Sequence, residues 1–182
     1  MHEAIEPRPS ARRTYLIMLI IGAALVAGCG GKDSSTGNGI LNPDGNNNQN
    51  PTVSAQMAGV YHVVTTIRDC NTNQEYPGDA SDDTLCAGSN FKDALAGAGI
   101  TPTITKEGDS YRMVWDQSGT DEQGCHLAQH INLVLTYSSS TYNVTGQITT
   151  TVQPAGCETY PACLGITVAG TKTGPVPTGA CQ

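Results

Sequence analysis

The chain is poor in basic and aromatic residues. Of its 182 residues, nine are lysine or arginine and 16 are aspartate or glutamate, which gives a net charge of −7. Tryptophan and phenylalanine occur once each. Basic residues do not cluster, which argues against nucleic acid as a partner and against docking to anionic lipid through charge.

Sequence motifs of catalysis and metal binding are also missing. The chain has no Gly-x-Ser-x-Gly nucleophile motif, no glycine-rich phosphate motif and no Cys-x-x-Cys pair. We therefore expect no catalytic residue, no metal site and no cofactor. Because serine, histidine and aspartate all occur, a metal-dependent or hydrolytic enzyme is kept as a further alternative.

No apolar run reaches the length of a membrane span. The longest, residues 15–27, has 13 residues, whereas a span needs about 20. A polar segment with Arg12-Arg13 precedes it, and the small pair Ala27-Gly28 follows it. This order of zones is typical of an export signal rather than of an uncleaved helix. The arginine pair fits either the general export route or a twin-arginine route.

The end of this signal, Leu25-Val26-Ala27-Gly28-Cys29, resembles the lipobox of bacterial lipoproteins. The resemblance implies that residues 1–28 are a signal peptide and that Cys29 is lipidated as the mature N-terminus. It implies two or three acyl chains, which hold a protein on a membrane far more firmly than one. Gly30, where inner-membrane lipoproteins carry Asp, favours the outer membrane. We expect an exported, lipid-anchored protein of the bacterial cell envelope.

Residues 29–56 form the second segment. They are rich in Gly, Asn, Ser and Pro and nearly devoid of apolar residues, so they cannot bury enough surface to offset the entropy of ordering. We predict a flexible tether that begins at the lipidated Cys29 and spans roughly 30 Å as a coil. The remaining residues, 57–182, suit one domain.

Alternation of apolar and polar residues dominates this domain and predicts an all-β fold, either an antiparallel β-sandwich or a small β-barrel. A hairpin of residues 125–137 and 141–152 is the strongest pattern. The other predicted strands cover 60–68, 101–106, 111–116 and 164–172, and a short helix covers 90–98.

Six cysteines remain once Cys29 is set aside, and their even number in an oxidising compartment predicts three disulfides. They are Cys70, Cys86, Cys125, Cys157, Cys163 and Cys181. Six cysteines allow 15 pairings. Pairing of cysteines that lie close together in the sequence favours Cys70–Cys86 and Cys157–Cys163. The remaining pair, Cys125–Cys181, would join the C-terminal tail to the central hairpin.

Two sets of polar residues could bind a metal. His126 and His130 share one face of a predicted strand, about 13 Å apart, so an exposed polar face is the favoured interpretation. His62 would join them only from a neighbouring strand. The acidic segments 79–83 and 116–122 alternate oxygen-bearing side chains as calcium loops do, but acidic turns are common for local hydrogen-bonding reasons.

The aromatic residues are either the core of the domain or the lining of a ligand cavity. The candidates for facing a ligand are Tyr61, Tyr111, Trp115, Tyr137 and Tyr142. The opening Gly59-Val60-Tyr61 strand, the later hairpins and the disulfide-tied tail resemble small calycin-like barrels. Because the Gly-x-Trp opening of lipocalins is missing, the resemblance implies no particular ligand.

These observations predict a non-enzymatic envelope protein that displays a small β-domain for binding or structural contact. Its partners would be the membrane, through the N-terminal lipid, and an envelope protein or small ligand that the sequence does not identify. The alternative is a calycin-like barrel that carries a small apolar ligand.

Overall fold

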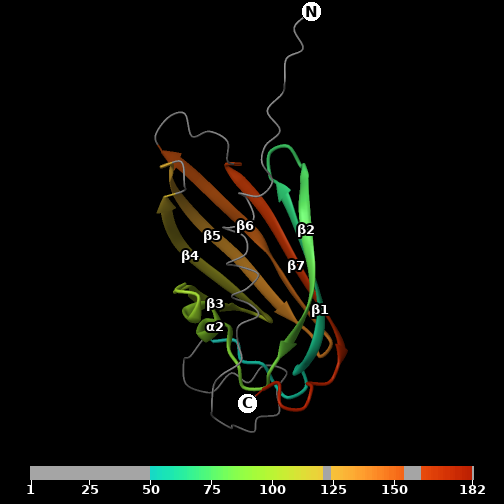
Figure 1. The fold of residues 1–182 in the computed structure, drawn as a ribbon. Helices are drawn as coiled ribbons and strands as arrows, with labels where there is room; N and C mark the ends of the chain where they lie inside the picture. The colour runs from blue at the N-terminus through green and yellow to red at the C-terminus, as the bar shows by residue number, and fades with distance from the viewer. Residues whose placement is uncertain (1–49, 121–123, 154–160, 182) are drawn as a thin grey trace, which may run out of the picture.

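The computed structural model describes residues 50–120, 124–153 and 161–181, which form one antiparallel sheet and a short helix (Figure 1). The predicted signal peptide, Cys29 and nearly all of the tether lie outside these residues. The all-β prediction is confirmed. The elements are β1 (Gly59–Asp69), β2 (Glu75–Leu85), α2 (Phe91–Gly97), β3 (Thr103–Glu107), β4 (Ser110–Thr120), β5 (His126–Tyr137), β6 (Thr141–Gln153) and β7 (Cys163–Gly174).

The sheet has the order β2-β1-β7-β6-β5-β4-β3, so the first strand lies beside the last. All neighbouring pairs are antiparallel, and the sheet curls so that one face lines the interior (Figure 1). The sheet is not closed into a complete barrel, because β2 and β3 are edge strands in the described part of the chain. An opening therefore separates β2 from the β3–β4 hairpin.

Alternate residues of the strands form a continuous apolar inner face. The burial of β4 and β5 alternates residue by residue, as their sequence predicts. One row across the sheet runs through Tyr111, Leu135, Val144 and Val168, which are all 4 % exposed or less. Each such side chain stabilises the fold by about 1.5–3 kcal/mol relative to exposure. Burial of this face is therefore the main source of stability.

The end of the sheet at the β5–β6 turn is covered by α2 and by the chain that leads into β1. Asn90 caps α2 by accepting a hydrogen bond from the Asp93 backbone N–H. Phe91 and Leu95 of the helix are buried together with Val53. The packed chain thus extends into the range assigned to the tether. Within the described ranges, no helix is long and apolar enough to cross a membrane.

Strand β2 was not predicted from the sequence. Its segment contains Pro77, Gly78 and several aspartates, which are residue types that occur rarely in strands. It forms because β1 pairs with it over nearly its whole length, with an irregularity between Thr65 and Ile67. A Cβ at Gly78 would overlap the Thr65 carbonyl oxygen, so a glycine permits this irregularity. The proline and the charges are typical of a protected edge strand.

Disulfides join distant segments, and the predicted local pairing is wrong. Cys70 pairs with Cys163, and Cys86 pairs with Cys181. Cys70 and Cys86 lie beyond opposite ends of β2, which as an 11-residue strand spans about 36 Å, so they cannot reach each other. Cys125 is also disulfide-bonded, but not to Cys181 as predicted.

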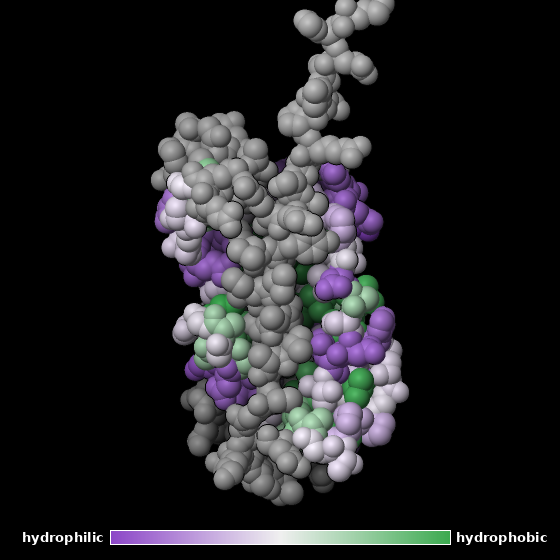
Figure 2. Space-filling model, in the orientation of Figure 1, coloured by the Kyte–Doolittle hydropathy of each residue, from purple (hydrophilic) through white to green (hydrophobic). Residues whose placement is uncertain are grey.

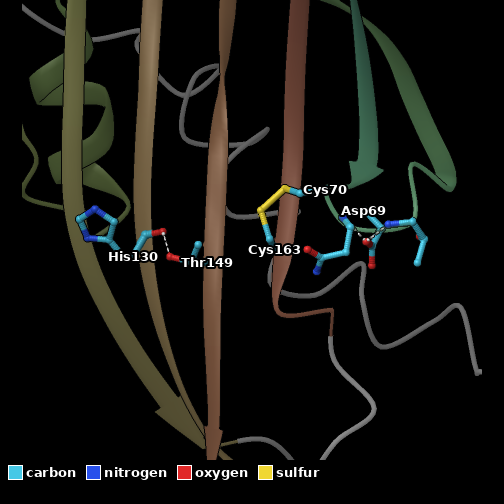
Figure 3. The surroundings of a disulfide bond; sticks show 7 residues. Asp69, Cys70, His130, Thr149 and Cys163 are labelled. Atoms are coloured by element: carbon cyan, nitrogen blue, oxygen red, sulfur yellow. Dashed lines mark hydrogen bonds between the residues drawn. A yellow bond between two sulfur atoms is a disulfide. The ribbon is translucent and has the colours of Figure 1, made fainter.

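The disulfide Cys70–Cys163 lies at the end of β1 farthest from α2 (Figure 3). The adjoining residue Asp69 accepts hydrogen bonds from the backbone N–H groups of Asn71 and Thr72 at 2.7 and 2.9 Å. These bonds hold the pKa of Asp69 below its usual value, and the bond from the Thr72 N–H has the largest effect. The turn after β1 is therefore held both covalently and by a carboxylate.

A glycine allows the close approach of β5 and β6. A Cβ at Gly146 would overlap the Asn132 carbonyl oxygen and the Leu133 backbone, whereas one at Gly119 meets open space. We expect Gly146→Ala to lower the free energy of unfolding by about 1–3 kcal/mol, as overpacking does. The matched Gly119→Ala should leave it unchanged or raise it slightly. Denaturant unfolding of both variants measures this, and equal effects would contradict the proposed contact.

Candidate binding site on the inner face

The five aromatic residues considered as ligand-facing all lie on the inner face of the sheet. They come from β1, β4, β5 and β6: Tyr61, Tyr111, Trp115, Tyr137 and Tyr142. Tyrosine rings gather at the α2 end, where Tyr61 and Tyr142 have centroids 5.4 Å apart and Tyr111 and Tyr137 lie 6.3 Å apart. Figure 2 shows apolar side chains towards the middle of this face of the molecule and hydrophilic side chains towards its outer margins.

Two of these aromatic residues carry buried polar atoms without a hydrogen-bond partner among the described residues: Trp115 Nε1 and Tyr137 OH. Tyr61 differs, because its hydroxyl donates to the Met57 carbonyl oxygen at 2.7 Å. A buried polar group left unpaired costs about 1–3 kcal/mol, so such groups are rare in folded proteins. Both unpaired groups are donors, and a ligand that offers acceptor oxygens would satisfy them.

Burial keeps the tyrosines protonated. It raises the pKa of Tyr137 well above the usual value, and the neighbouring Tyr111 adds to the effect. Burial also raises the pKa of Tyr142, with further contributions from Asp83 and Tyr61. The Tyr137 hydroxyl therefore remains a hydrogen-bond donor at physiological pH.

Asp83 is a buried carboxylate beside this aromatic cluster. It lies opposite Tyr61 in the β1–β2 pair and is 7 % exposed. The Ser81 hydroxyl donates a hydrogen bond to the Asp83 carboxylate at 3.5 Å, a long contact. Burial is the main cause that raises the pKa of Asp83, and nearby Asp82 raises it further against the opposing effect of Ser81. The carboxylate thus destabilises the fold when it is charged.

The other end of the inner face is polar. Gln117 Nε2 donates to Gln129 Oε1 at 2.7 Å, and Gln129 Nε2 donates to Thr150 Oγ1 at 3.3 Å. These residues lie in one row across β4, β5 and β6. Trp115 lies between this polar row and the aromatic cluster, one inward position from Gln117 along β4.

The outer face carries a shallow polar depression of about 490 Å³ over the same three strands. His130 Nδ1 and Asp116 Oδ1 are 2.8 Å apart within it, and the Thr149 hydroxyl donates to the His130 carbonyl oxygen at 3.4 Å (Figure 3). The side chains that line it from the outer face are Asp116, Ser118, Ala128, His130, Thr149 and Thr151. Ala128 is small, which leaves the hollow.

The histidines are not brought together. His126 and His130 are exposed on β5, while His62 lies on β1 and is paired with Asp82 at 2.9 Å. Strands β7 and β6 lie between β1 and β5. Among the described residues, no group of three or more His, Cys, Asp or Glu is placed to hold a metal ion.

The acidic segments proposed as calcium loops are strands where the structure describes them. Residues 79–83 belong to β2 and residues 116–120 to β4. In an extended strand Asp79 and Asp83 share a face but are about 13 Å apart along the chain, while the successive residues Asp82 and Asp83 point to opposite faces. Residues 116–120 hold a single carboxylate, that of Asp116. Asp83 and the glutamine row were missed by the sequence interpretation, since reading residues 79–83 as a turn hid the inward position of Asp83.

Comparison of the chain with protein-family models, curated proteins and solved structures found no match.

The buried Asp83 predicts an inverse dependence of stability on pH. Because its folded-state pKa lies above the ordinary value of 3.8, folding favours the protonated form. The stabilisation that the protonated Asp83 gives to the fold is fully present below the ordinary pKa and is lost as pH rises through the folded-state pKa. Asp83→Asn should therefore unfold at a higher denaturant concentration than the wild type at neutral pH, and the difference should disappear near about pH 3.

The matched control is Asp82→Asn, which alters an exposed carboxylate on the same strand. It should give at most a small part of the gain at neutral pH, because Asp82 raises the pKa of Asp83 less than burial does. A destabilised Asp83→Asn variant at neutral pH would show that the carboxylate has a favourable partner and would contradict the assignment.

Proposed function

We propose that the chain is an exported lipoprotein of the cell envelope, anchored through Cys29, whose β-domain binds a partner without catalysing a reaction. The observation that carries the proposal is the disulfide bonding of Cys70, Cys86, Cys125, Cys163 and Cys181. Disulfides persist in exported proteins and are rare in the cytosol, which agrees with the export signal and lipobox-like end of residues 1–29.

The position where the described chain begins supports display of the domain. Thr52 pairs with Asn90 at the α2 end, so the tether reaches the domain there. The turn after β1 and the adjoining ends of β4, β5 and β6 lie at the opposite end (Figure 1). On a membrane-bound tether, the α2 end would be the attached end of the domain, and the opposite end would be the free one.

Binding suits the chemistry of the inner face better than catalysis does. Its unpaired polar atoms are the donors Trp115 Nε1 and Tyr137 OH, set in an apolar surface. Such a surface recognises a ligand by shape, apolar contact and a few hydrogen bonds.

A second candidate function is transport or storage of a small apolar molecule. The specific observation that favours it is the same pair of unpaired donors among five inward aromatic residues. A ligand with an apolar body and a carbonyl or ester oxygen would pair one of the donors and cover the rings.

Replacing Cys29 tests the anchor. Cys29→Ala should abolish incorporation of radiolabelled palmitate and leave the precursor unprocessed, because the lipid is attached to the cysteine sulfur. Labelling of the full chain expressed in a bacterial host measures both effects. The control Cys70→Ala removes a disulfide cysteine and should keep full labelling. Unchanged labelling of Cys29→Ala would overturn the proposed anchor.

Native mass spectrometry tests the second candidate. If the domain is a carrier, the full chain purified from its own envelope should retain a noncovalent mass that organic extraction removes. Tyr137→Phe should reduce the retained fraction several-fold, because it removes one donor while keeping the ring. A protein that carries no extra mass under gentle extraction would contradict the carrier function but not the anchor.

A further inference from the structure

Strand β4 is longer than the strand that covers its edge. β3 pairs with β4 from Glu107 opposite Ser110 to Thr103 opposite Val114, and there the pairing stops. The preceding residue on the β3 side is Pro102, which has no N–H to donate. From Trp115 to Thr120, β4 therefore has no neighbour on this side among the described residues.

The turn geometry identifies which backbone groups are unpaired. Gly108 has φ +62° at the first position of a two-residue turn, so Glu107 and Ser110 form its hydrogen-bonded closing pair. Backbone groups along an antiparallel strand alternate between its two neighbours. Ser110, Arg112 and Val114 thus face β3. By the same alternation, the backbone groups of residues 116, 118 and 120 point to the uncovered edge.

An unpaired side-chain donor lies at the start of this edge. Trp115 is 5 % exposed, is directed to the inner face, and has no acceptor for its Nε1–H among the described residues. The next inward side chains along β4 are Gln117 and then Gly119, where a Cβ would meet open space. The edge therefore combines unpaired backbone donors and acceptors with room for side chains beyond the buried Trp115.

We propose that the uncovered edge of β4 binds an extended polypeptide segment of a partner protein, which adds to the sheet as a further strand. This inference rests on the binding function proposed above and names the class of partner that would be bound. An extended peptide presents backbone groups at the repeat of β4 and carbonyl oxygens along its length. Its backbone groups pair with those of residues 116, 118 and 120, and its inward side chains lie beside Trp115. An acyl chain cannot pair these backbone groups.

Charge defines the partner further. Carboxylates are exposed on both strands that border the opening: Asp79 and Asp82 on β2 and Asp116 on β4, of which Asp82 and Asp116 each lie beside one histidine. The chain as a whole has a net charge of −7. A segment with lysine or arginine at its ends and an apolar residue opposite Trp115 fits this surface. A second copy of the chain would bring like charge. Residues 30–49 also have a net negative charge, from Asp33 and Asp44 against Lys32.

A synthetic peptide tests the proposal with the full chain. The probe is a seven-residue peptide of alternating valine and threonine with a lysine at each end. Binding should change the emission of Trp115, the only tryptophan in the chain. It should also slow hydrogen exchange at the backbone amides of Asp116, Ser118 and Thr120. Amides of Gln117 and Gly119, which face β5, should already be slow in the free protein.

Matched variants of the peptide and of the protein separate strand addition from nonspecific contact. N-methylation of the peptide at alternate residues on the pairing edge should abolish binding, whereas methylation on the opposite edge should preserve it. In the protein, Ser118→Pro removes one edge N–H and should weaken binding by roughly fivefold to tenfold, while Ser118→Ala should bind as the wild type does. The N-methylated peptides keep the test decisive if the proline variant does not fold.

Several outcomes would overturn the proposal. Slow exchange of the amides of residues 116, 118 and 120 in the free protein would mean that the chain itself covers the edge. A dimer in sedimentation velocity that Ser118→Pro abolishes would assign the edge to a second copy. Equal binding of both methylated peptides would exclude strand addition. None of these results bears on palmitate labelling of Cys29, so failure here is distinguishable from failure of the proposed anchor.

Discussion

The pairing of β1 with β7 is the constraint on which the rest of the fold depends. It joins the first and last strands of the domain over a register from Val60 opposite Gly174 to Asp69 opposite Leu164. Without it, β1 and β2 would be a detached hairpin, and a single two-stranded hairpin is marginal in water. With it, one curled sheet holds Tyr61 and Val63 of β1 in the same core as the central hairpin.

This pairing also explains what the sheet leaves unsatisfied. Placing β1 beside β7 makes β2 and β3 the edge strands of the described sheet. The segment that connects β2 to β3 in the chain forms α2 rather than another strand. The short β3 cannot cover all of β4. The unpaired Trp115 indole lies where that cover ends. The unpaired Trp115 Nε1, one of the two polar atoms that make the inner face a candidate site, is thus located where an edge strand ends.

Much of the strand content could be predicted because each strand depends on its own alternation. The hairpin of β5 and β6 shows this, as apolar side chains at every second position fix both the strand and its buried face. The same alternation placed Trp115 and the tyrosines on one face. β2 could not be found in this way, since partner strand β1 stabilises a segment whose own residues disfavour a strand.

The site was less predictable, for a related reason. Whether Trp115 Nε1 or the Tyr61 hydroxyl finds an acceptor depends on neighbours such as Met57, which are set by packing and not by local sequence. The disulfides depended on the missed strand. Once β2 is placed, Cys70 and Cys86 lie at opposite ends of the domain, and the nearest cysteines in sequence are no longer the nearest in space.

The interleaved disulfides set an order of events for biogenesis. Cys70 and Cys86 bond to partners 93 and 95 residues later in the chain. If the chain crosses a membrane unfolded and N-terminus first, these two thiols reach the oxidising side together and well before either native partner. Any bond that forms between these two thiols has to be broken by thiol–disulfide exchange before β2 can extend between them. A chain that folds before its thiols are oxidised brings the native partners together first, so the disulfide pattern makes the speed of maturation depend on whether folding precedes oxidation.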